Sequence, residues 1–197
     1  MSTPTVTRPE RRKHTTLPAV AASSLAGTAV EWYDFFLYGT AAALVFNKLF
    51  FPSGDPVVST MLAMGTFAAG FLARPLGALV LGHYGDKHGR KTTLVASLLL
   101  MGIATALIAV IPPYASIGVW APLLLLFLRL VQGFALGGEW GGAVLLVSEY
   151  SDDSTKRAFW ASWPNVGPPL GNLLAAGVLA ILSAVLPQAE FLAWGWR

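Results

Sequence analysis

Long apolar stretches separated by short polar connections dominate the chain after residue 16. Five stretches match or exceed the roughly 20 residues that a helix needs to cross about 30 Å of hydrocarbon. They span residues 19–46, 57–81, 92–111, 117–146 and 158–186. Because lipid offers no hydrogen bonds to the backbone, each stretch is predicted to be helical. The pattern therefore predicts an all-α membrane protein with about five transmembrane helices.

The connections between these stretches are polar. Two of them, residues 50–56 and 112–116, contain the prolines that mark turns. The other two, residues 82–91 and 151–157, are charged. Residues 1–16 are polar and basic, and they are predicted to form a tail outside the bundle.

The basic residues predict how the chain is oriented. Most of the lysine and arginine lies in the tail and in the two charged connections, whereas the connections on the opposite side hold only Lys48 and Arg197. Cytoplasmic loops of membrane proteins carry the excess of positive charge. The tail and the two charged connections are therefore expected in the cytoplasm, with the N-terminus on that side.

Composition supports the membrane prediction and excludes several functions. The chain is 55% hydrophobic and 12% charged, and its mean hydropathy is +0.61, whereas soluble domains carry about 25% charged residues. The net charge of +3 is explained by the cytoplasmic loops and does not indicate a nucleic-acid partner. With no cysteine and three dispersed histidines, no catalytic residue, metal site or cofactor is expected, and the chain is not expected to be an enzyme.

Ionisable residues inside the apolar stretches are the candidate functional residues, because such residues are costly in lipid and usually face the bundle interior. Glu31 and Asp34 are three apart and share a helix face. Asp34 and Arg129 lie at similar depth near mid-membrane, and so do Arg74 and Glu139 somewhat closer to the cytoplasm. Each pair is either a static salt bridge that fixes packing or a protonatable carboxylate whose pairing changes during transport.

Small residues predict close helix packing. Glycines recur four apart in the fourth and fifth stretches, which lets helix backbones approach one another. The alternative is that these glycines line a groove in which the solute binds. The repeats are Gly133, Gly137 and Gly141, Gly138 and Gly142, and Gly167 and Gly171. A kink or local unwinding is expected in the fifth stretch at Pro164, Pro168 and Pro169.

Four blocks resemble the major facilitator superfamily, and in particular its metabolite:proton symporter branch of proline/betaine, alpha-ketoglutarate, citrate and shikimate carriers. They are VEWYDFFLYG at 30–39, ARPLGALVLGHYGDKHGRK at 73–91, LRLVQGFALGGEWGGA at 128–143 and WGWR at 194–197. The resemblance implies a twelve-helix carrier of two six-helix halves. Residues 17–197 would be the N-terminal transmembrane half-domain, ending before helix 6, and a C-terminal half-domain would be its partner.

The same resemblance implies roles for individual residues. Arg129 and Gln132 look like the motif tied to proton coupling, with Asp34 or Glu31 as the acid. Asp86 resembles the loop acid that faces a helix N-terminus of the other half, and Glu149 resembles the acid that pairs with the loop arginine. The implied gating residues are Gly82, Asp86, Lys87, Gly89, Arg90, Lys91 and Glu149.

These observations lead to one hypothesis and two alternatives. The chain is expected to belong to a proton symporter of the inner (plasma) membrane that takes up a small organic acid or zwitterion. A mid-membrane acid would bind the proton, and Arg74 or Arg129 would attract a solute carboxylate. The expected partners are lipid, the solute and protons. The alternatives are a uniporter or antiporter of the same fold, and a truncated membrane fragment that does not transport.

Overall fold

The computed structural model describes residues 16–137, 144, 147–148, 151 and 154–197, and of residues 90, 91 and 154 it describes only the backbone. Every regular element in this part of the chain is a helix, in agreement with the all-α prediction. The helices are α1 (Leu17–Ala41), α2 (Asn47–Leu49), α3 (Pro56–His88), α4 (Arg90–Val110), α5 (Tyr114–Ile117), α6 (Trp120–Gly137), α8 (Ser154–Ala161), α9 (Gly167–Val185) and α10 (Gln188–Glu190). Short π-helical turns follow α1 at Ala42–Phe46 and α10 at Phe191–Gly195.

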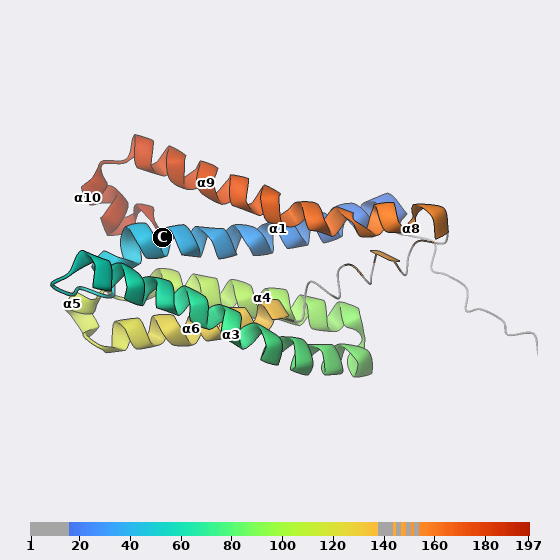
Figure 1. The fold of residues 1–197 in the computed structure, drawn as a ribbon, viewed down its shortest axis with the longest axis horizontal. Helices are drawn as coiled ribbons and strands as arrows, with labels where there is room; N and C mark the ends of the chain where they lie inside the picture. The colour runs from blue at the N-terminus through green and yellow to red at the C-terminus, as the bar shows by residue number, and fades with distance from the viewer. Residues whose placement is uncertain (1–15, 138–143, 145–146, 149–150, 152–153) are drawn as a thin grey trace, which may run out of the picture.

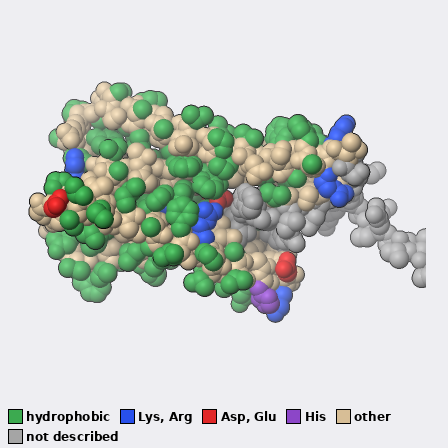
Figure 2. Space-filling model, viewed as in Figure 1, with side chains coloured by type: hydrophobic (Ala, Val, Ile, Leu, Met, Phe, Trp, Pro, Cys, Tyr) green, Lys and Arg blue, Asp and Glu red, His purple; other side chains and the backbone are tan. Residues whose placement is uncertain are grey.

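Four helical spans of the described chain are long and apolar enough to cross a membrane: Pro56–His88, Thr92–Val110, Trp120–Gly137 and Thr155–Val185. The 25-residue α1, which holds Glu31 and Asp34, is the fifth long helix. Large apolar side chains such as Leu72, Leu79 and Val185 are more than 70% exposed. Green hydrophobic side chains cover the length of the face in Figure 2, and most charged ones lie near its two ends. An apolar exterior of this kind suits lipid.

One expected loop is helical. Residues 82–91 were predicted to be a connection, but α3 continues through His88 and α4 begins at Arg90. Polar residues mark where a helix leaves the hydrocarbon, not where its hydrogen bonding stops. The break falls at Gly89, whose φ of +95° is strained for any residue with a side chain.

Two groups of helices make up the bundle. Figure 1 shows α9 lying along α1, and α3, α4 and α6 forming a second group beside them. Thr105 of α4 and Gln132 of α6 bridge the two groups by bonding to Asp34 of α1. The functional candidates of α1 therefore lie at the junction between the groups.

Helices approach one another most closely at glycines. A Cβ on Gly133 would collide with the backbone of Gly70, and one on Gly77 would collide with the backbone of Phe134. On the other side of the bundle, a Cβ on Gly171 would lie 2.6 Å from the backbone nitrogen of Tyr33. The expectation of close packing is confirmed where these stripes are described, whereas residues 138, 141 and 142 lie outside the described residues.

The prolines of the fifth stretch do interrupt it. α8 ends at Ala161, a 3-10 turn covers Trp163–Val166, and α9 starts at Gly167 with prolines in its first turn. Proline is tolerated there because the first-turn N–H groups have no helical partner. The prediction of local unwinding is confirmed.

Candidate functional site

The helical repeat of α1 places three polar side chains on one inward face. Glu31, Asp34 and Tyr38 follow one another at spacings of three and four residues. Glu31 is fully buried and Tyr38 is 5% exposed, although both lie in a helix that is apolar overall. The Tyr38 hydroxyl is 2.7 Å from Thr66 Oγ1 of α3, which fixes the orientation of its ring.

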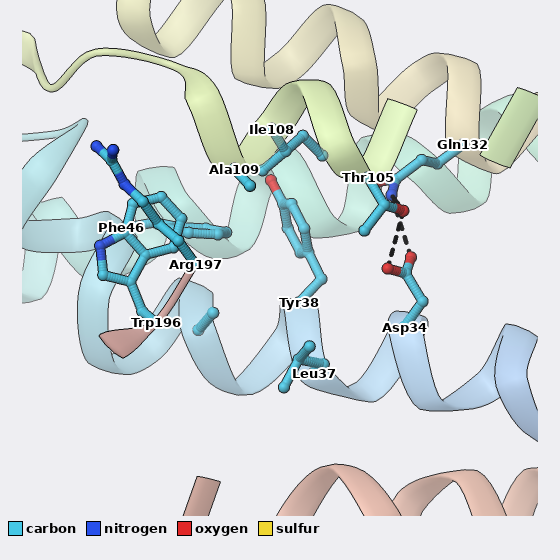
Figure 3. A pocket seen from close by; sticks show the side chains of 11 residues that line it. Asp34, Leu37, Tyr38, Phe46, Thr105, Ile108, Ala109, Gln132, Trp196 and Arg197 are labelled. Atoms are coloured by element: carbon cyan, nitrogen blue, oxygen red, sulfur yellow. Dashed lines mark hydrogen bonds between the residues drawn. The ribbon is translucent and has the colours of Figure 1, made fainter. Parts of the chain in front are cut away.

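Asp34 and Arg129 are connected through a glutamine. Thr105 Oγ1 donates to Asp34 Oδ1 at 2.9 Å, and Gln132 Nε2 donates to Asp34 Oδ2 at 3.1 Å. Gln132 Oε1 in turn accepts from Arg129 Nη1 at 3.1 Å. The direct ion pair expected from their depth is therefore replaced by an amide bridge, with Gln132 between the acid and the base. Figure 3 shows the two bonds to Asp34.

Aromatic rings surround the Arg129 guanidinium. Its central carbon lies 4.1 Å from the ring centroid of Tyr38, 5.0 Å from that of Phe35 and 5.1 Å from that of Phe67. Such contacts are worth about 2 kcal/mol or more when they are desolvated. Within the described residues, Nε and Nη2 have no hydrogen-bond partner. Arg129 is thus 2% exposed, and in the described part of the chain its guanidinium contacts three rings and one amide oxygen.

A glycine makes room for this arginine. A Cβ on Gly70 of α3 would lie 3.0 Å from Arg129 Nε and 3.3 Å from its Cγ. The stem of the side chain therefore runs across the bare backbone of α3. Gly70 is a supporting residue that sequence reasoning did not select.

Arg74 pairs with α1. Its Nη2 lies 4.0 Å from Glu31 Oε1, and its guanidinium faces the rings of Trp32 at 5.5 Å and Phe71 at 5.8 Å. Its expected partner Glu139 lies outside the described residues. The second arginine of the site is therefore also matched to an acid of α1.

A cavity of about 70 Å³ lies beside Asp34. Asp34, Thr105 and Gln132 form its polar end, and Tyr38, Phe46 and Trp196 supply aromatic walls. Arg197 also lines it, and Figure 3 shows Arg197 and Asp34 on opposite sides of Tyr38. A second cavity of about 10 Å³, large enough for about one water, is lined by Arg129 and by both acids of α1.

The implied gating residues are only partly described. Gly82, Asp86 and Lys87 are exposed on the last two turns of α3, and Gly89 breaks the helix. Arg90 and Lys91 occupy the first turn of α4 by backbone position alone, and Glu149 lies outside the described residues. Their pairing remains a prediction. In the described part of the chain, no group of His, Asp or Glu could hold a metal ion.

Thr105→Val is expected to destabilise the site by about 1–2 kcal/mol. The change removes the donor to Asp34 Oδ1 while keeping the side-chain shape, and a buried acceptor left without its donor costs about that much. Thermal unfolding in lipid nanodiscs measures the difference. Thr93→Val is the control in the same helix, because its hydroxyl makes only a 3.5 Å bond to Gly89 O. Equal stability of the two variants would contradict the account.

Comparison with known proteins identifies the family. Residues 19–197 match the family described as sugar (and other) transporter. The chain therefore belongs to this family of the major facilitator superfamily. It is a transporter-family chain and not an enzyme.

Curated relatives agree with this assignment. The chain is 52% identical over 178 residues to the inner membrane metabolite transport protein YhjE of Escherichia coli (strain K12), and 51% identical over 177 residues to the shikimate transporter of the same organism. It is 47% identical over 179 residues to the proline/betaine transporter of Salmonella typhimurium. The first two alignments cover 90% of this chain and 40% of the relative, and the third covers 91% and 35%. The chain thus spans about two fifths of the length of these relatives. No solved structure matches it significantly.

Proposed function

We propose that this chain forms the N-terminal part of a proton symporter that takes up a small organic acid or zwitterion across the inner membrane. The observation that carries the proposal is the amide bridge between Asp34 and Arg129, of which Asp34 and Gln132 line a cavity between the helix groups. Carboxylates inside membrane bundles commonly relay protons. The names of the relatives, which include shikimate and proline/betaine transporters, support this class of solute.

The orientation of the Gln132 amide would depend on whether Asp34 is protonated. With Asp34 ionised, the amide N–H₂ faces the carboxylate and the amide oxygen faces Arg129. A protonated Asp34 becomes a hydrogen-bond donor. The amide would then turn its oxygen toward Asp34 and present its N–H₂ group to Arg129. Arg129 would lose its bond to Gln132. Protonation of Asp34 would therefore also change the hydrogen bonding of Arg129.

Orientation and gating complete the proposal. The N-terminus and residues 82–91 would face the cytoplasm, as the distribution of lysine and arginine favours. The exposed end of α3, with Asp86 and Lys87, would contact a second half-domain when the cytoplasmic side closes. Alternating access needs two such halves around one site.

Uptake driven by an imposed gradient tests the proposal. The membrane product that carries this chain is purified through an N-terminal tag and reconstituted in liposomes. Labelled shikimate and glycine betaine are then offered with and without an inward proton gradient. Symport predicts accumulation of one of them that collapses when a protonophore is added. Equilibration without accumulation would indicate a uniporter, and stimulation by an outward proton gradient would indicate an antiporter.

A further inference from the structure

The Arg74 guanidinium is able to take a further hydrogen-bond acceptor. Its acid partner is Glu31, whose Oε1 lies 4.0 Å from Nη2, and that distance is beyond the length of a hydrogen bond. In the part of the chain that the structure describes, none of the guanidinium N–H groups makes a hydrogen bond. A guanidinium carries five such donors in a fixed planar fork. Arg74 can therefore bind an acceptor without giving up a hydrogen bond that it already makes.

The position of Arg74 is fixed by the close packing of α3 on α6. A Cβ on Gly137 of α6 would collide with the carbonyl oxygen of Arg74, so the two helix backbones touch at this residue. The guanidinium carbon lies 5.5 Å from the ring centroid of Trp32 and 5.8 Å from that of Phe71. Contacts of this kind stabilise the positive charge without requiring a hydrogen-bond acceptor. The side chain is thus presented from a rigid backbone and beside two rings.

Arg74 is also the more accessible of the two arginines of the site. Its side chain is 21% exposed, and the neighbouring Phe71 is 42% exposed. Arg129 is buried against three rings and already donates to Gln132. A charged guanidinium within a membrane bundle is expected to face a polar space and not the lipid. A dissolved anion can therefore reach Arg74, whereas reaching Arg129 requires the packed rings to move.

Glu31 sets how strongly Arg74 attracts an anion. Glu31 is fully buried, so water screens its charge less than it would at a surface. A carboxylate 4.0 Å away offsets part of the positive charge of Arg74, and an anionic solute must share the guanidinium with it. Removing the charge of Glu31 would therefore strengthen the attraction between Arg74 and the solute.

We infer that Arg74 binds the carboxylate of the transported solute and that Glu31 competes with this carboxylate for the guanidinium. The apolar body of the solute contacts the rings of Trp32 and Phe71. The inference rests on the proposed function, since it names the residue that contacts the organic acid or zwitterion. A planar guanidinium suits a carboxylate, because it offers parallel N–H bonds to both oxygens. An ester of the same solute, which lacks the negative charge, binds poorly at such a site.

Carboxylates and their methyl esters test the inference. Shikimate and glycine betaine each carry a carboxylate, and their methyl esters lack that negative charge. Calorimetric titration of the native membrane product in nanodiscs, with no proton gradient, compares each acid with its ester. We expect at least one acid to bind, and to bind at least about tenfold more tightly than its ester. Equal binding of acid and ester, or no binding of either acid, would overturn the inference.

Substitutions of Arg74 locate the site. Arg74→Gln should weaken binding of the acid by about tenfold or more and leave binding of the ester unchanged. Arg74→Lys keeps the charge but loses the planar fork, so it should weaken binding less. Arg157→Gln is the matched control, since Arg157 is exposed on α8 and its guanidinium donates to the Ser151 carbonyl. A folded Arg74→Gln variant that still prefers the acid as strongly as the unaltered protein does would overturn the inference.

Glu31→Gln tests the competition. The change removes the competing charge, so it should tighten binding of the acid by about tenfold and leave binding of the ester unchanged. The gain should disappear when Arg74→Gln is also present, because both substitutions act on one ion pair. A Glu31 that only supports packing would instead weaken binding of acid and ester alike, and that result would overturn the competition. If Arg74→Gln does not fold, Glu31→Gln and the comparison of acid with ester still decide.

Uptake measurements separate this inference from the proposed function. The binding experiments need no gradient, whereas symport is measured as accumulation of the solute in liposomes with an imposed proton gradient. Binding that depends on Arg74, in a protein that does not accumulate the solute, would refute symport and leave the Arg74 site standing. Proton-driven accumulation that Arg74→Gln leaves unchanged would refute the site alone.

Discussion

Asp34→Asn is expected to abolish accumulation of the solute while leaving exchange of solute across the membrane. Asparagine cannot take the proton, yet it keeps the size of the side chain, and its one carbonyl oxygen can still accept from Thr105 or from Gln132. One proton moving down a gradient of about two pH units supplies about 2.7 kcal/mol, which supports roughly 100-fold accumulation. The variant should therefore fall from that ratio to about one.

Reconstituted liposomes with an imposed proton gradient measure this ratio directly. Asp55→Asn is the matched control. Asp55 caps α3 by accepting from Val57 N at 2.7 Å, and asparagine caps a helix about as well as aspartate. Its accumulation ratio should equal that of the unaltered protein. Accumulation by Asp34→Asn at the unaltered level would contradict the role given to Asp34.

Gly77→Ala and Gly133→Ala are expected to unfold or rearrange the α3–α6 pair. The added methyl group would collide with the backbone of Phe134 in the first variant and with that of Gly70 in the second. Overpacking typically costs about 1–3 kcal/mol. We expect the upper end of that range or more, because an opposing backbone cannot move aside as a side chain can.

Gly65→Ala is the control for this effect. Gly65 belongs to the same helix as Gly77, but no atom of the described residues lies within 4 Å of where its Cβ would stand. Alanine is favoured over glycine inside a helix by about 1 kcal/mol, so this variant should be slightly more stable. Thermal unfolding of the three variants in nanodiscs compares them. Similar stability of Gly77→Ala and Gly65→Ala would show that the two helices do not pack as closely as described.

The long helices could be predicted from the sequence because the bilayer sets their length and lipid forces backbone hydrogen bonding inside each segment. The helix ends were less certain. Hydropathy reports where a helix leaves the hydrocarbon, and α3 continues to His88 beyond that point. The stop at Gly89 depends on a positive φ, which the sequence permits but does not require.

The sequence predicted which charged residues form the candidate site, but it did not predict the hydrogen bonds and ion pairs between them. Depth along the helices indicated that Asp34 and Arg129 would be close. Depth alone does not show which face of a helix points where, so the bridge through Gln132 and the pairing of Arg74 with Glu31 needed the packed structure. Thr105 could have been singled out from the sequence, because after Thr93 the long apolar stretch 92–111 holds only two polar residues, Ser97 and Thr105.

The aromatic groups were harder to find. Phe35 and Phe67 look like ordinary apolar residues of membrane helices, and only the structure places them around Arg129. Trp196 and Arg197 lie far along the chain from α1. The fold nevertheless places them close to Phe46, which the Trp196 ring contacts (Figure 3). Contacts between residues so distant in sequence depend on the tertiary fold.

Solute-induced proton movement tests the central claim most directly. Cells that overproduce the native product are suspended in a lightly buffered medium, and the external pH is followed with an electrode as shikimate or glycine betaine is added. Symport predicts that the medium becomes more alkaline for the transported solute, and that the change is absent with Asp34→Asn. Entry of the labelled solute without any change in pH, or with acidification, would contradict proton symport.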